Sequence, residues 1–272
     1  MTNILLPFSY PVMADAALIA VIVAVPAAML SCFLVLKGWA LMGDGISHAV
    51  LPGVVLAYAA GVPLLVGAFI AGMICALASG WLDANSRIKP DTALGVVMSG
   101  LFALGLILFT VFPPGVHLDH ILFGNILGIG PGDFAQAIPI ALAVTLALAL
   151  KWRDFAVLAF DPVQARVSGL TVGWLHYGML AMIAASVVAM LSAVGIILAV
   201  GLLIAPGAIA FLMTRRLSVM LVLAVTIAVG ASLAGVWSSF WLDSAPAPTI
   251  IVILTALFVL AFLWRQIADR QG

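Results

Sequence analysis

An aspartate and a histidine, Asp44 and His48, stand four residues apart inside an apolar stretch. In a helix this spacing places both side chains on one face, one turn apart. Ionisable side chains are costly inside a membrane-spanning helix, and those found there usually face a cavity or a partner. A carboxylate oxygen and an imidazole nitrogen together suit divalent ions such as manganese, iron or zinc. This pair is therefore our first candidate for chemistry.

Three interpretations of the pair stay open from the residues alone. It can bind a divalent metal ion, hold two helices together through an internal hydrogen bond, or relay protons. One chain supplies two ligands, whereas a two-fold dimer with this helix at its axis would supply four. Because the ligand forms are neutral imidazole and ionised carboxylate, low pH should weaken metal binding. Pro52 and Gly53 follow the pair and are expected to interrupt the helix, which frees nearby carbonyl groups.

The composition around the pair is that of an integral membrane protein. Of the 272 residues, 66% are hydrophobic and 7% are charged, whereas soluble proteins carry about 25% charged residues. The ten Lys and Arg balance ten acidic residues, so the chain lacks the net positive charge of a nucleic-acid-binding protein. Every acidic residue is Asp, which excludes sites that need Glu, such as the H-E-x-x-H metalloproteases.

Apolar segments of spanning length recur along the whole chain. A spanning helix needs about 20 apolar residues. Nine segments approach this length, namely 14–36, 41–60, 62–82, 93–112, 134–150, 177–193, 195–213, 218–240 and 248–264. We therefore expect an all-α, polytopic transmembrane bundle with about eight or nine spans, some of them broken or re-entrant. No linker or soluble domain is recognisable, so residues 1–272 are treated as one domain.

The basic residues predict how these spans are oriented. With nine crossings, all Lys and Arg fall in connections on the side of the C-terminus: Lys37, Arg87, Lys89, Lys151, Arg153, Arg166, Arg215, Arg216, Arg265 and Arg270. Cytoplasmic connections of membrane proteins carry the excess of Lys and Arg. We therefore expect the N-terminus outside and the C-terminus inside.

The segment around the pair resembles the membrane permeases of manganese/zinc/iron-type ABC importers. The resemblance rests on residues 40–53, which read ALMGDGISHAVLPG, and on residues 122–127, 160–170 and 194–207 in the expected order. It implies a fold related to the type II importers of cobalamin and siderophores, in the bacterial inner membrane. The Ser-His-Ala-Val-Leu-Pro-Gly form is more similar to manganese and iron importers than to the zinc branch.

The resemblance also implies the working assembly. Asp44 and His48 would line the path of the transported ion at the interface of a homodimer. Cytoplasmic ATPase subunits would drive transport, and an extracytoplasmic metal-binding protein would deliver the ion. Apart from that ion, no bound cofactor is implied. The chain has no G-x-x-x-x-G-K-[ST] motif with which to hold ATP phosphates, so it is not expected to be an enzyme by itself.

Two inner segments are candidates for contact with the ATPase. Similarity to the related permeases places the coupling segment near Pro206, Gly207, Arg215 and Arg216, although simple anchoring of the two arginines at the membrane surface remains the alternative. The range 161–170 is predicted to form a short surface helix, because Asp-Pro is a start signal and a glycine at 169 is a stop signal. This helix contacts the ATPase or only connects two spans.

An outer connection holds three further metal-binding side chains within four residues, His117, Asp119 and His120. They could attract a divalent ion, but we prefer to interpret them as part of a solvated loop. The main alternative function is a secondary transporter or channel that uses Asp44 and His48 for ion or proton coupling without an ATPase.

Overall fold

The computed structural model describes residues 6–112 and 126–271, and these ranges contain helices and no strand. The elements are η1 (Pro7–Ser9), α1 (Pro11–Lys37), α2 (Met42–Ala49), α3 (Leu51–Ala60), α4 (Leu64–Asn85), α5 (Pro90–Val111), α7 (Pro131–Phe160), α8 (Pro162–Val167), α9 (Val172–Met213), α10 (Leu217–Leu242) and α11 (Pro246–Gln271).

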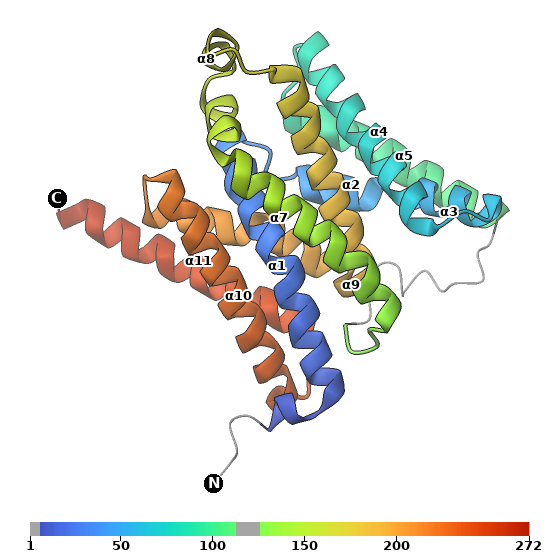
Figure 1. The fold of residues 1–272 in the computed structure, drawn as a ribbon, viewed down its shortest axis with the longest axis vertical. Helices are drawn as coiled ribbons and strands as arrows, with labels where there is room; N and C mark the ends of the chain where they lie inside the picture. The colour runs from blue at the N-terminus through green and yellow to red at the C-terminus, as the bar shows by residue number, and fades with distance from the viewer. Residues whose placement is uncertain (1–5, 113–125, 272) are drawn as a thin grey trace.

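Most of these helices are long and apolar enough to cross a membrane. Within the described ranges, eight segments meet this description: α1, α4, α5, α7, the two parts of α9, α10 and α11. The start of α1 and the end of α11 lie far apart (Figure 1). The prediction of an all-α, multi-spanning fold is thus confirmed.

The segment 41–60, predicted as a span that is interrupted near Pro52 and Gly53, forms two short helices. α2 ends at Ala49, α3 begins at Leu51, and Pro52 stands in the first turn of α3. Proline has no N–H and therefore cannot donate to the carbonyl of His48, four residues earlier. Gly105 of α5 lies against this break, since a Cβ there would come within 2.8 Å of the Leu51 side chain.

The long helix α9 is likewise two helices that meet at Gly195. This residue has φ 81° and ψ 169°, a backbone conformation that glycine adopts far more readily than other residues. The spans predicted at 177–193 and 195–213 therefore exist as separate helices, which meet at this glycine.

Helix α1 lies at the centre of the molecule. It contacts α7, α9 and α10, and 72% of its most apolar stretch is buried, the largest such share among the eight segments. In Figure 1, α10 and α11 lie on one side of it, and α3, α4 and α5 lie on the other. Small residues allow close packing at this centre: a Cβ on Gly207 of α9 would lie 2.5 Å from the Ser31 carbonyl oxygen of α1.

Helices α3 and α4 approach each other even more closely. A Cβ on Gly53 would overlap the backbone carbonyl of Gly67, and a Cβ on Gly67 would overlap that of Gly53. Such glycine contacts are typical of membrane proteins, where helices associate through van der Waals packing of backbones. This contact fixes α3, and with it the end of α2, against α4.

The short helix α8 has the boundaries that the sequence predicts. The predicted start lies at Asp161, whose side chain accepts hydrogen bonds from the backbone N–H groups of Val163 and Gln164 at 2.8 and 3.0 Å. Gly169 then reverses the chain with φ +78°. In Figure 1, α8 lies at one extreme end of the molecule.

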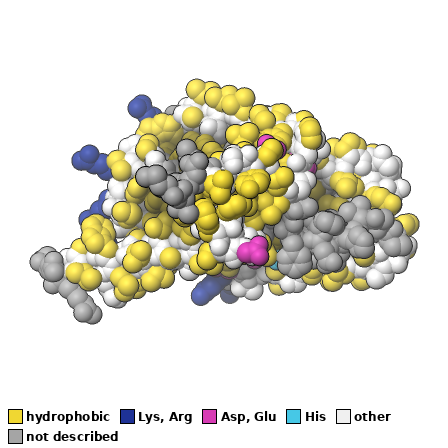
Figure 2. All heavy atoms as spheres, turned by 90° about the horizontal axis from the view of Figure 1, so that it is seen from below, with side chains coloured by type: hydrophobic (Ala, Val, Ile, Leu, Met, Phe, Trp, Pro, Cys, Tyr) yellow, Lys and Arg dark blue, Asp and Glu magenta, His cyan; other side chains and the backbone are white. Residues whose placement is uncertain are grey.

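The opposite end of the molecule is shown in Figure 2. Hydrophobic side chains predominate on this face, an acidic side chain lies within it, and Lys and Arg are visible only at its edges.

Candidate metal centre

Helix α2 carries both candidate ligands and is enclosed by three other elements, α4, α5 and α9. It is preceded by a turn at Gly38, whose φ of +68° is in the left-handed region. The turn ends α1 and lets the chain enter α2 in a new direction (Figure 1). The candidate ligands therefore lie on a short helix inside the bundle and not on a surface loop.

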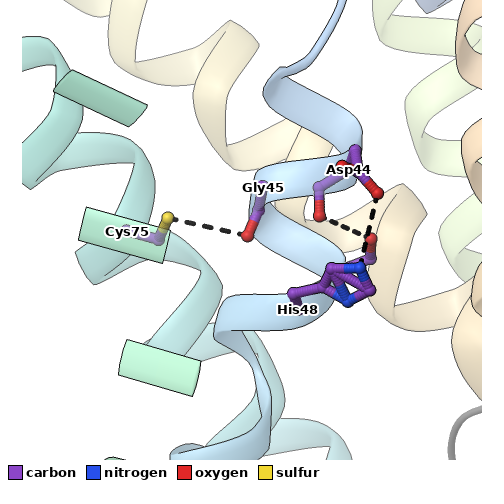
Figure 3. Close-up of polar contacts among 5 residues, drawn as sticks. Asp44, Gly45, His48 and Cys75 are labelled. Carbon is purple, nitrogen blue, oxygen red and sulfur yellow. Dashed lines mark hydrogen bonds and ion pairs between the residues drawn. The ribbon is translucent and has the colours of Figure 1, made fainter. Parts of the chain in front are cut away.

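Asp44 and His48 face each other along one side of α2, as their spacing predicts. The Nε2 atom of His48 lies 3.6 Å from Oδ1 of Asp44, and 36% of each side chain is exposed. Figure 3 shows both side chains on the side of the helix that faces away from Cys75 of α4. The pair is thus open on one side, where another group or an ion can approach.

The separation of these atoms suits two ligands of one ion. Zinc–nitrogen and zinc–oxygen distances of about 2.0–2.2 Å at a tetrahedral angle place the two ligand atoms about 3.4 Å apart. A direct hydrogen bond between the same atoms would bring them to about 2.7–3.2 Å. The observed 3.6 Å is longer than such a hydrogen bond, and it is compatible both with an ion pair and with two ligands of one ion.

The rest of the His48 imidazole is held by packing. Its ring centroid lies 5.6 Å from that of Phe102 on α5. Its Nδ1 atom is buried and has no hydrogen-bond partner among the described residues. Metal-binding histidines usually have a hydrogen-bond partner at the second nitrogen. In the described residues, the position of this ring depends on the aromatic contact with Phe102 instead.

Asp44 and His48 are the two candidate ligands that the described part of one chain brings together. Within the described ranges, no three His, Cys or acidic side chains come close enough to hold a metal ion. We call Asp44 and His48 the candidate half-site, because a complete site would need ligands from elsewhere. The carbonyl of His48, to which Pro52 cannot donate a hydrogen bond, lies on the same short segment.

The position of α2 is set by two glycines that flank Asp44. A Cβ on Gly45 would lie 2.6 Å from Cδ1 of Leu94 on α5, and a Cβ on Gly43 would lie 2.7 Å from Cδ1 of Leu203 on α9. Both leucines occupy the space that a larger residue would need. Gly45 therefore allows α2 to lie close to α5.

Replacing Gly45 by alanine is expected to raise the KM for metal uptake several-fold. The new methyl group must displace Leu94 or push α2 away, and such overpacking costs about 1–3 kcal/mol. Leu94→Ala in the same chain removes the obstacle, so the double variant should recover most of the lost affinity. Uptake kinetics of the two single variants and the double variant measure this coupling.

Gly95→Ala is the matched control, because no atom of another residue lies within 4 Å of the position that its new methyl group would take. Its KM should stay close to that of the unmodified chain. Additive effects of Gly45→Ala and Leu94→Ala, with no recovery in the double variant, would show that the contact does not position α2.

The predicted coupling residues do not form one surface. Pro206 and Gly207 are buried within α9, whereas Arg215 and Arg216 are exposed in the connection between α9 and α10. Any contact that a partner subunit makes at this segment would therefore involve the two arginines and not Pro206 or Gly207. The outer-loop candidates His117, Asp119 and His120 lie outside the described residues.

The sequence did not predict one cluster of polar side chains near α2. Ser79, Asp83, Asp91 and His176 line a small pocket of about 20 Å³ together with Met42 of α2. These residues come from α4, α5 and α9, which are distant in sequence, so no local motif connects them. The charge of Asp83 and Asp91 at span ends is the only signal that could have suggested a polar region here.

The chain is similar to known proteins over nearly its whole length. The model of the ABC 3 transport family matches residues 9–265. The chain is 50% identical over 268 residues to the chelated iron transport system membrane protein YfeD of Yersinia pestis, covering 97% of this chain and 90% of that protein. It is 43% identical over 265 residues to the manganese transport system membrane protein MntC of Halalkalibacterium halodurans, with 97% and 90% coverage.

The fold of the chain also matches that of a solved structure. The fold matches a chain of PsaBC from Streptococcus pneumoniae, solved in complex with Fab, with a TM-score of 0.85 and 32% sequence identity, covering 96% of this chain and 94% of that one. The family predicted from residues 40–53 is confirmed by matches that extend over nearly the whole length. The chain therefore belongs to the ABC 3 transport family, as a multi-spanning membrane protein.

Proposed function

We propose that this chain is the permease subunit of an ATP-driven importer of a divalent transition metal, with manganese as the first candidate and iron and zinc as the alternatives. The observation that carries the proposal is the half-site of Asp44 and His48 on α2, between spanning helices. A carboxylate and an imidazole suit these ions. Relatives named for manganese and for chelated iron transport support the same substrate class.

The ion would pass between two copies of the chain. Two copies related by a two-fold axis would contribute two Asp and two His, a four-ligand set that one copy does not possess. The exposed side of the pair is where the second copy would approach. Alternating access would then open this shared site first to the outside, where a metal-binding protein delivers the ion, and next to the inside.

The orientation in the bacterial inner membrane follows from the basic residues. We place the ends of α1, α4, α7 and α9 inside, since Lys and Arg cluster at these connections and at the C-terminal end of α11. This assignment counts α2 and α3 together as one crossing in addition to the eight long segments, and it places the N-terminus outside. The end with α8 faces the cytoplasm, where ATP is available to a partner subunit.

Helix α8 has the surface properties of an ATPase contact. Val163 and Val167 are 68% and 77% exposed and lie one turn apart on the same face, while Ala165 is buried and attaches the helix to the bundle. At six residues, α8 is too short to span a membrane, so hydrocarbon does not account for the exposed valines. Arg215 and Arg216 remain a second candidate contact.

The experiment that tests this function is metal uptake into proteoliposomes. The chain is reconstituted alone, and in a second sample with its ATPase and metal-binding protein. Uptake of manganese, iron and zinc should require the partners and ATP, and should stop with an ATPase variant that cannot hydrolyse ATP. Uptake by the chain alone, driven by an ion gradient, would instead establish the secondary transporter.

A further inference from the structure

A pocket of about 450 Å³ lies at the end of the bundle where α1, α7 and α9 end and α10 begins. Its polar side chains are Thr214, Arg215 and Arg265, and its apolar wall includes Leu36, Phe160 and Phe211. Two guanidinium groups thus stand beside an apolar wall. This combination suits a ligand with an anionic head and an apolar body.

A second hollow adjoins this pocket between the helices. It has a volume of about 330 Å³ and is lined by apolar residues of α9, α10 and α11, including Ile209, Leu223, Ile227 and Leu257. Met213 lines both hollows, and Trp264 of the second is the neighbour of Arg265. The apolar groove therefore leads from the arginines toward the middle of the spanning helices.

The depth of the two hollows matches a lipid. Arg215 lies in the connection between two spans, and Arg265 lies near the end of the span Pro246–Ala268. Leu223, Ile227 and Leu257 lie well inside their spans. Basic pockets between spanning helices at the cytoplasmic surface typically bind anionic lipid head groups.

We propose that these hollows bind one anionic phospholipid, with its phosphate at Arg215 and Arg265 and an acyl chain in the groove between α10 and α11. A free phosphate would use the arginines but leave the apolar groove without a role. An acidic segment of the ATPase could also contact the arginines, but it would leave the apolar groove empty, because a cytoplasmic protein does not reach between spanning helices. The groove therefore favours a lipid over a free phosphate and over an ATPase segment.

The test measures lipid binding to the purified full chain by native mass spectrometry after removal of bound lipid. Phosphatidylglycerol should bind at least about tenfold more tightly than zwitterionic phosphatidylethanolamine. Arg215→Gln with Arg265→Gln should remove most of this preference and weaken phosphatidylglycerol binding about 10- to 30-fold, since each basic residue near the surface contributes to the attraction.

Arg87→Gln with Arg153→Gln is the matched control. It makes the same change of charge at exposed arginines of the same end, outside the pocket, and should leave binding unchanged. Arg215→Gln alone alters only an exposed connection and is the second variant if the double variant does not fold. It should still weaken phosphatidylglycerol binding about threefold or more.

Several results would overturn the proposal. These are equal binding of the two lipids, equal losses in the pocket and control variants, and full displacement of phosphatidylglycerol by inorganic phosphate at millimolar concentration. Loss of ATPase co-purification in the pocket variant with unchanged lipid binding would assign the arginines to the ATPase instead. Because lipid binding is measured without metal or ATP, its outcome does not depend on the proposed transport function.

Discussion

Replacing Asp44 or His48 by alanine is expected to lower metal uptake by the complete transporter at least about 100-fold. Mutation of residues that only orient a metal ligand typically lowers metal affinity or activity about 10- to 100-fold. Asp44 and His48 are the proposed ligands themselves, so the loss should be at least as large. The symmetry of a dimer would deepen the loss, because each substitution removes two of four ligands. ATP-dependent manganese uptake into proteoliposomes measures the effect.

Asp44→Asn makes this test sharper. The amide has nearly the shape of the carboxylate but no charge, so the packing of α2 should be kept while the anionic ligand is lost. Uptake should fall with Asp44→Asn almost as far as with Asp44→Ala, while the thermal stability of the purified chain changes little. A stability loss that parallels the transport loss would favour the interpretation of the pair as a structural link between helices.

Ser47→Ala is the matched control on the same helix. Ser47 is buried, but its hydroxyl donates to the backbone oxygen of Asp44 at 2.8 Å and not to its carboxylate. Uptake should therefore stay close to normal. Near-normal uptake by both Asp44→Ala and His48→Ala would refute the ligand role and with it the proposed path of the ion.

Replacing Val163 and Val167 by aspartate is expected to abolish ATP-dependent uptake while the metal half-site stays intact. Buried against an ATPase, the two carboxylates would have to lose their water, and unpaired buried charge is strongly unfavourable. ATP-dependent uptake should fall at least about tenfold, and co-purification of the ATPase should be lost. Metal binding to the purified chain should not change, because α8 lies at one extreme end of the molecule (Figure 1) and packs against α7 and α9.

Arg215→Ala with Arg216→Ala distinguishes the two inner segments. If α8 is the main contact, this pair of substitutions should leave ATPase co-purification largely intact. The reverse result would be normal ATPase co-purification with the valine variants and its loss with the arginine variants. That result would establish the connection between α9 and α10 as the segment that contacts the ATPase.

The proximity of Asp44 and His48 was predictable because it depends on local geometry. Residues four apart in a helix share a face whatever surrounds that helix, so the sequence alone placed Asp44 beside His48. The limits of α8 were predictable for the same reason, since an aspartate cap and a glycine stop act within a few residues. The spanning segments followed from runs of apolar residues of sufficient length.

The interruption of segment 41–60 was only partly predictable. Pro52 was expected to disturb the helix, but a proline in a membrane helix produces a bend or a complete break according to what packs beside it. The close approach of Gly105 on α5 and of Gly67 on α4 decides this case. Both residues are far from Pro52 in sequence, and their contact with the segment is seen only in the folded chain.

The sequence by itself determined the class of protein and the placement of Asp44 and His48 on one helix face, because each depends on composition or on neighbours within about one helical turn. Tertiary structure alone decided that Leu94 lies against Gly45, that Pro206 and Gly207 are buried, and that Arg215 and Arg265 share one pocket. Such contacts join helices that are distant in the chain. Nearly every face of these helices is apolar, so hydrophobic pattern does not specify which faces meet, and shape complementarity selects the pairs.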